Sequence, residues 1–168
     1  MNKLVILVLS LILMATIIIE AVIFLRIFRF PFVQITFLGA THSLTHWIGW
    51  IGTLYIAFST PLQPIVKRKA PKRLKAMLNI HMAGNMLAVL LVSIHFAHQV
   101  TRPLSSYPDL GTGVVLYAVM VLLVATGMAM YSGKVTRFSK QTRFLHPGFA
   151  LTFYSVIIVH ILQGVAII

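Results

Sequence analysis

Hydrophobic residues occur along this sequence in long runs, and the runs are separated by short segments rich in basic residues and proline. Five runs are long enough to cross a bilayer core as an α-helix, which takes about 20 mostly apolar residues. They occupy residues 4–27, 45–66, 76–100, 110–131 and 144–168. The pattern predicts an all-α fold, an integral membrane helical bundle with five transmembrane helices.

The composition favours the same fold class. Of 168 residues, 59% are hydrophobic and only 10% are charged, which leaves too little polar surface for a soluble domain. We expect a single membrane domain over residues 1–168, with the first helix and its loop in 1–40 and a four-helix core in 41–168. The first run is too long for the apolar region of a signal peptide and lacks a small-residue cleavage site, so we expect a retained helix.

The basic residues are distributed unevenly between the loops. The formal net charge is +12, and ten basic residues fall in two loops: Lys67, Arg68, Lys69, Lys72, Arg73 and Lys75 in one, Lys134, Arg137, Lys140 and Arg143 in the other. The positive-inside rule then predicts a multi-pass protein of the cell or inner membrane, with a cytoplasmic N-terminus and the C-terminus outside. Anionic lipids are the expected partner of this charge, and nucleic acid is not expected.

Two histidine pairs have the same spacing. His81 and His95 lie fourteen residues apart in the third run, and His146 and His160 lie fourteen apart in the fifth. Fourteen helical residues fall about 40° short of four turns and rise about 21 Å, so each pair shares a helix face. Two parallel helices side by side would supply two facing pairs, one above the other. This arrangement suits two stacked haems.

The expected ligands can be assigned by depth. His81 and His146 would hold an inner haem, and His95 and His160 an outer haem. His98 lies seventeen residues from His81, about 100° away from the shared face, so we do not expect it to bind iron. The sequence contains no cysteine, so the cofactors would be two non-covalent haem b groups. The alternative is that these histidines only form hydrogen bonds between helices.

A glycine pair repeats the same spacing in the fourth run. Gly113 and Gly127 are also fourteen residues apart. Glycine would let a flat ligand approach the backbone closely, at the depths of the two proposed haems. Ordinary packing of small residues between membrane helices is the alternative.

These spacings resemble the four-helix haem-binding core of two families. One is cytochrome b of the quinol-oxidising bc-type complexes, and the other is the transmembrane domain of ferric reductases and NADPH oxidases. The similarity covers runs two to five, about three quarters of the chain. It implies that the four paired histidines are axial ligands on the second and fourth helices of the core, with the glycine pair on the helix between them. No flavin, nicotinamide or quinone-site signature accompanies the resemblance.

Other polar residues are candidates for supporting roles. Arg102 and Arg143 are expected either to bind haem propionates or to anchor helices at the interface. His42 and His46, four residues apart on one predicted helix face, would gather with His98 near the outer surface. That group would form a quinol, metal or electron-acceptor site, or else a solvated loop end. Glu20 is expected in a structural pair, for which Arg26 is the nearest partner in sequence.

The sequence therefore predicts a di-haem b-type membrane cytochrome that carries electrons across the bilayer. It would be an electron-transfer subunit of a quinol-linked respiratory oxidoreductase, with other redox subunits as partners. One alternative is a stand-alone transmembrane reductase that passes electrons to an extracellular acceptor. The other is a non-redox metal transporter.

Overall fold

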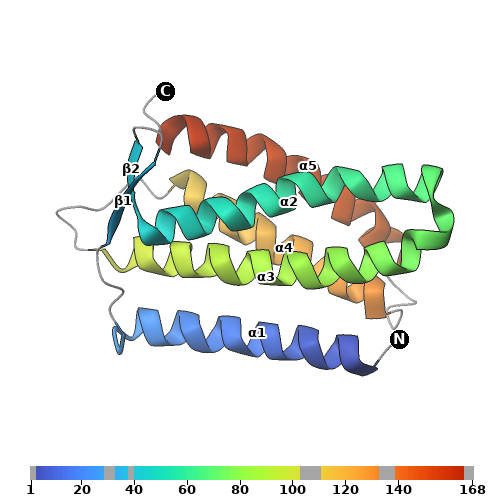
Figure 1. The fold of residues 1–168 in the computed structure, drawn as a ribbon, viewed down its shortest axis with the longest axis horizontal. Helices are drawn as coiled ribbons and strands as arrows, with labels where there is room; N and C mark the ends of the chain where they lie inside the picture. Colours follow the sequence, from blue (N-terminus) through green and yellow to red (C-terminus); the bar gives the residue numbers. More distant parts are fainter. Residues whose placement is uncertain (1–2, 29–32, 38–39, 103–110, 133–138, 165–168) are drawn as a thin grey trace. The chain divides into compact units, whose positions relative to one another are not determined.

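The computed structural model describes residues 3–28, 33–37, 40–102, 111–132 and 139–164. The chain divides into two compact units, Met1–Tyr107 and Pro108–Ile168, which are described separately. The elements of the first unit are α1 (Lys3–Phe24), β1 (Gln34–Phe37), β2 (Ala40–Ser43), α2 (Leu44–Lys69), the 3-10 turn η1 (Pro71–Arg73) and α3 (Leu74–Val100) (Figure 1). The second unit consists of α4 (Gly111–Ser132) and α5 (Ser139–Gly164).

Four helices in the described part of the chain are long and apolar enough to cross a membrane. They cover Leu4–Phe24, Pro71–Val100, Gly111–Tyr131 and Lys140–Gln163. The prediction that the protein consists mainly of helices, several of them long and apolar enough to cross a membrane, is confirmed. α2 has 26 residues but is more polar and does not belong to this set. The predicted bounds at residues 110 and 165–168 lie outside the described residues.

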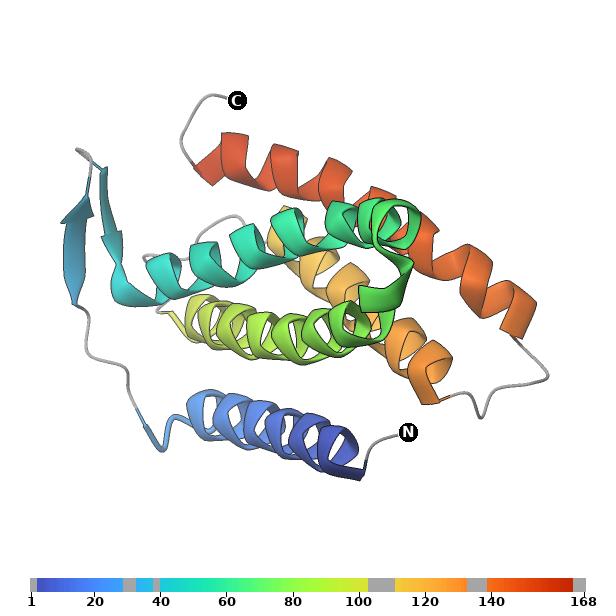
Figure 2. The same ribbon diagram turned by 45° about the vertical axis from the view of Figure 1, so that its right-hand side comes forward.

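In the first unit α3 packs against both α1 and α2. Figures 1 and 2 show α1 and α3 running in the same direction and α2 running in the opposite one. The reversal between α2 and α3 needs only a short turn, in which Pro71 occupies the first position of η1. Proline fits there because a first helical turn leaves its N–H groups without intrahelical partners.

Small residues set how closely α2 approaches α3. A Cβ atom added at Gly52 would lie 2.7 Å from the Ala88 carbonyl oxygen, so the two backbones nearly touch at this point. Further along, the Tyr55 ring covers Gly84, and its hydroxyl donates to the Ile80 carbonyl oxygen at 3.1 Å. Close packing through small residues is the usual way for membrane helices to associate, since lipid gives them no hydrophobic incentive.

The end of α1 is fixed by a Schellman motif. Arg26 adopts a left-handed conformation with φ of 55°. Its N–H donates to the Ile23 carbonyl, and the Ile27 N–H donates to the Val22 carbonyl, each at 3.0 Å. These bonds satisfy carbonyls that the helix end would otherwise leave open. Arg26 is exposed.

A short β-hairpin precedes α2, and the hydrophobic pattern does not predict it. Its strands are antiparallel, with Thr36 opposite Thr41 and their hydroxyls 2.8 Å apart. The Trp47 indole donates to the Ile35 carbonyl at 3.1 Å, and the Leu44 N–H donates to the Val33 carbonyl at 2.8 Å. These bonds connect the hairpin to the first turns of α2.

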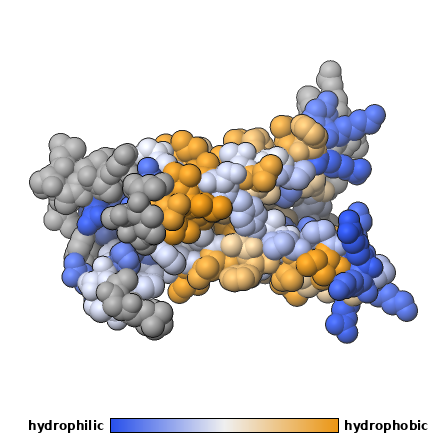
Figure 3. Space-filling view, turned by 90° about the horizontal axis from the view of Figure 1, so that it is seen from above, coloured by the Kyte–Doolittle hydropathy of each residue, from blue (hydrophilic) through white to orange (hydrophobic). Residues whose placement is uncertain are grey.

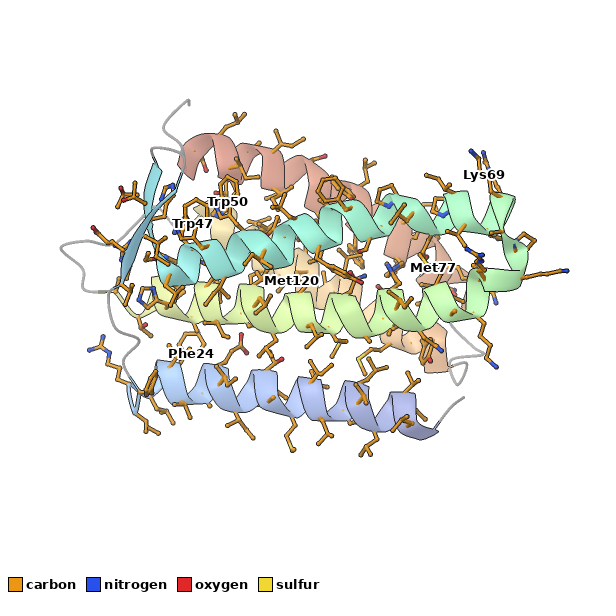
Figure 4. The ribbon with its side chains drawn as sticks, viewed as in Figure 1. Phe24, Trp47, Trp50, Lys69, Met77 and Met120 are labelled. Atoms are coloured by element: carbon orange, nitrogen blue, oxygen red, sulfur yellow. The ribbon has the colours of Figure 1, made fainter. Side chains whose placement is uncertain are left out.

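The two ends of α2 have different side chains. Trp47 and Trp50 lie at the end next to the hairpin, and Lys69 lies at the other end (Figure 4). The basic residues of the α2–α3 turn are all exposed: Lys67, Arg68, Lys69, Lys72, Arg73 and Lys75. Figure 3 shows apolar side chains along the middle of the visible helices and hydrophilic ones towards their ends. Arg29, Lys134 and Arg137 lie outside the described residues.

In the second unit α4 packs against α5, and the two helices are antiparallel. α5 begins at Ser139, five residues before the predicted run, and continues through Pro147. As a result Lys140 and Arg143 belong to the first turns of the helix, where both are exposed.

Replacing Gly52 with alanine should lower the free energy of unfolding by about 1–3 kcal/mol, the usual cost of overpacking. The new methyl group would meet a backbone oxygen, which cannot move aside as a side-chain tip would. Titration with SDS in detergent micelles, followed by circular dichroism, measures the loss. Gly148→Ala is the control, because a Cβ there meets no atom within 4 Å. Equal losses in both variants would contradict the close approach.

Candidate functional site

Each of the two histidine pairs lies on one unbroken helix. His81 and His95 belong to α3, and His146 and His160 belong to α5. All four side chains are half-buried. The helical geometry behind the fourteen-residue spacing is therefore present in both units, and each pair spans about 21 Å along its own helix.

His95 lies against α2 within the first unit. A Cβ atom at Gly49 would come within 2.8 Å of the His95 Cγ atom, so only glycine leaves room for the ring at this point. The His46 ring meets it edge-on, with ring centroids 4.6 Å apart. Thus α2 supplies a small residue and an aromatic edge to this histidine.

His81 is connected to α2 through an amide. The Asn85 side-chain nitrogen lies 3.2 Å from His81 Nδ1 and 3.1 Å from its Nε2. The Ser59 hydroxyl of α2 donates to the Asn85 amide oxygen at 3.0 Å. This chain of polar groups connects the histidine to α2.

The two histidines of α5 are held by threonines of α4. The Thr126 hydroxyl lies 2.9 Å from His146 Nδ1, and the Thr112 hydroxyl lies 3.1 Å from His160 Nδ1. The Thr126 hydroxyl also donates to the Leu122 carbonyl at 2.8 Å, and that of Thr112 donates to the Gln163 side-chain oxygen at 2.7 Å.

These bonds determine which ring nitrogen of each α5 histidine carries the proton. A threonine hydroxyl has a single proton, and in both cases it is directed at an oxygen other than the histidine. When each hydroxyl gives its proton to that oxygen, it accepts from the imidazole, and Nδ1 of His146 and of His160 then carries hydrogen. In a neutral imidazole Nε2 is left with its lone pair. This is the tautomer that binds a metal through Nε2, with the other ring nitrogen hydrogen-bonded.

The glycine pair of α4 adjoins these threonines. A Cβ atom at Gly113 would lie 3.4 Å from His160 Cε1, which is ordinary contact, and Gly127 is buried. Gly113 thus lies beside a histidine ring as well as on the predicted face.

The structure brings His42 and His46 together, although they do not share a helix. His42 belongs to strand β2, before α2 begins, so its predicted place on a helix face is wrong. Its ring still stacks on His46 with centroids 5.0 Å apart. His98 has a different neighbour, because its Nδ1 atom lies 3.0 Å from the hydroxyl of Thr45, which is 2% exposed.

The remaining predicted residues occupy separate places. Arg102 is half-buried and donates to the Gln99 side-chain oxygen at 3.1 Å. Arg143 is exposed on the first turns of α5. Glu20 is half-buried in α1.

Sequence reasoning missed the polar partners of the histidines, although their spacing carried a signal. Thr112 and Thr126 immediately precede the glycine pair, so a Thr-Gly dipeptide occurs twice at an interval of fourteen. Asn85 and Gln99 likewise follow His81 and His95 by four residues each. Polar residues that repeat with the same fourteen-residue period as the histidines therefore indicate the partners of the histidine rings.

Comparisons with protein families, with curated proteins and with solved structures find no match for this chain. Among the described residues, no group of three or more His, Asp or Glu side chains is arranged to hold a metal ion. A haem needs only two axial ligands from protein and would not require such a group.

Replacing Thr45 with valine should destabilise the protein by about 1–3 kcal/mol, because a buried partner of the His98 ring is lost. Thr41→Val is the control, since the Thr41 side chain is exposed and its bond to Thr36 faces solvent. Unfolding in SDS measures both variants. The His98–Thr45 contact would be unimportant if the two substitutions had the same small effect.

Proposed function

We propose that this chain is a di-haem b-type membrane cytochrome that carries electrons across the bilayer. His81 with His146 would bind an inner haem, and His95 with His160 an outer one. The observation that carries the proposal is the equal fourteen-residue spacing of two histidine pairs on two membrane-length helices. Ionisable residues in membrane spans are costly and usually functional. Four histidines in two pairs of equal spacing would supply both axial ligands of two haems.

The donor set fits haem iron. On α5 both histidines have Nδ1 bonded to a threonine, which leaves Nε2 as the lone-pair nitrogen. On α3, His95 fits against the open surface of Gly49, and His81 is oriented by Asn85. An acceptor on the other ring nitrogen, as the threonines would provide on α5, is usual for metal-binding histidines.

The first unit supports a fifth span through α2. This helix packs antiparallel along α3, which qualifies as a span. From Trp50 to Lys67 the helix rises through seventeen residue steps, or about 26 Å, close to the roughly 30 Å of a bilayer core. Tryptophan at one end and exposed lysines at the other are typical of the two membrane interfaces. We propose that the basic end, where anionic lipids would bind, is cytoplasmic, as is the N-terminus.

Each haem would have a histidine on both faces of its iron, so no coordination position would be open to a substrate. Such haems would supply one-electron transfer. The four histidines would hold the two irons, and the fourteen-residue spacing would separate the two levels by about 21 Å along each helix. The sequence shows no flavin or nicotinamide motif, so the electrons would come from quinol or from another subunit. In this proposal the protein is an electron-transfer subunit of an oxidoreductase.

Purified protein should contain two haems per chain in a pyridine haemochrome assay. His95→Ala should remove one haem, because it deletes an axial ligand, while the other keeps its low-spin spectrum. His98→Ala on the same helix is the matched control and should retain both haems. A wild-type chain with one haem or none would contradict the proposal, and loss of a haem in His98→Ala alone would show that the ligands are wrongly assigned.

A lipid-soluble quinol should reduce the haems of the protein in liposomes at a rate that does not depend on salt. A quinone-site inhibitor should slow this reaction. Replacing Lys72 and Lys75 together with glutamate should leave the rate unchanged, because quinol reaches the protein from within the bilayer. If quinol fails and a soluble acidic redox protein reduces the haems in a salt-sensitive way, the donor is a protein that docks on the basic loops.

A further inference from the structure

We propose that Thr112 and Thr126 of α4 are positioning residues for the two haems. They would fix Nε2 of His160 and His146 as the iron-binding atoms before haem is present, and they would lower the reduction potential of each haem. The inference rests on the proposed function for its haem part. Its structural part concerns α4 and α5 alone, which belong to one unit.

The direction of each hydrogen bond is the first argument. The Thr126 hydroxyl has two carbonyl oxygens of its own helix within reach, Leu122 at 2.8 Å and Leu123 at 3.0 Å, and a proton given to either makes the hydroxyl an acceptor towards His146 Nδ1. An imidazole whose Nδ1–H is held in this way has both its ring plane and its tautomer fixed.

The antiparallel register of the helices is the second argument. Moving fourteen residues back along α4, from Thr126 to Thr112, corresponds to moving fourteen forward along α5, from His146 to His160. Both steps are close to four helical turns. One register therefore makes the same threonine–histidine contact at two levels, and a chance contact would not be expected to recur so regularly.

The histidines of α3 have different partners. His81 faces an amide nitrogen, which is a donor and does not require hydrogen on Nδ1. We infer that the hydroxyl acceptors of α4 fix the tautomer of the α5 histidines, whereas the amide at His81 does not fix a tautomer on α3. We infer that α4 and α5 form the preorganised half of each haem site.

An acceptor on Nδ1–H makes the imidazole a more basic ligand, which stabilises ferric over ferrous iron. Removing the acceptor should therefore raise the potential of the haem concerned. A tenfold change in the one-electron equilibrium corresponds to about 59 mV, and we expect a change of about this size.

Spectroelectrochemical titration of the full chain with haem bound tests the redox part. Thr126→Val should shift one haem towards the reduced form by about tenfold and leave the other unchanged, and Thr112→Val should do the reverse. The serine variants of both should keep wild-type potentials, because serine retains the hydroxyl. Thr152→Val is the matched control: the Thr152 hydroxyl bonds only the Gly148 carbonyl of its own helix among the bonds described for it. Equal shifts in the valine and serine variants would overturn the proposal.

Nitrogen-15 NMR of the haem-free full chain tests the structural part independently. With ¹⁵N-labelled histidine rings, His146 and His160 should give signals of the Nδ1–H tautomer, assigned through His146→Gln and His160→Gln. Thr126→Val should convert only the His146 signal to a mixture of tautomers, and Thr126→Ser should not. An unchanged His146 signal in Thr126→Val would overturn the positioning role. A converted signal in a chain that binds no haem would support that role and overturn the haem function.

Discussion

An imidazole inside a membrane helix is stabilised by a polar partner on a ring nitrogen, and contacts of this kind recur in both units. Buried polar groups without partners are expensive in a low-dielectric interior. Four histidines have polar partners: a threonine hydroxyl at His146, at His160 and at His98, and an asparagine amide at His81. At His95 the buried Nδ1 atom makes no hydrogen bond to a described residue, and the ring packs against Gly49 and His46. Where the partner belongs to another helix, as at His98, His146 and His160, the two helices must pack at a fixed register.

That register follows from helix geometry. In an antiparallel helix pair, the residue numbers of facing positions rise along one helix as they fall along the other. Features repeated every fourteen residues on both helices can therefore meet at two levels. α4 and α5 meet in this way, and one register places both threonine–histidine contacts. A shift of α4 by a single residue would turn its threonines by about 100° and separate both pairs at once.

Much of the fold could be predicted from hydrophobic run length, because a membrane helix must satisfy its own backbone. A helix covers most of each of the five predicted runs, although α1 ends at Phe24 and residues 110 and 165–168 lie outside the described residues. Both histidine pairs lie on unbroken helices, as their spacing required. The hairpin could not be predicted, since its strands are only four residues each and depend on bonds from Trp47 and Leu44. Because the hairpin was not predicted, His42 was wrongly placed on a helix. Its predicted proximity to His46 is correct, since the two rings stack. The threonine partners depend on interhelical register, which run length does not encode.

The two units have a common design that the sequence shows only indirectly. In each, a helix with a histidine pair packs antiparallel against a helix that supplies polar partners and glycine: α2 for α3, and α4 for α5. Glycine serves the histidine ring in both, at Gly49 for His95 and at Gly113 for His160. The supporting helix needs small and hydroxyl-bearing residues at these positions, so it must be less uniformly apolar than a helix that faces only lipid. α4 meets this need with two Thr-Gly pairs and still qualifies as a span, whereas α2 has three basic residues in its last turn and two internal prolines and does not qualify.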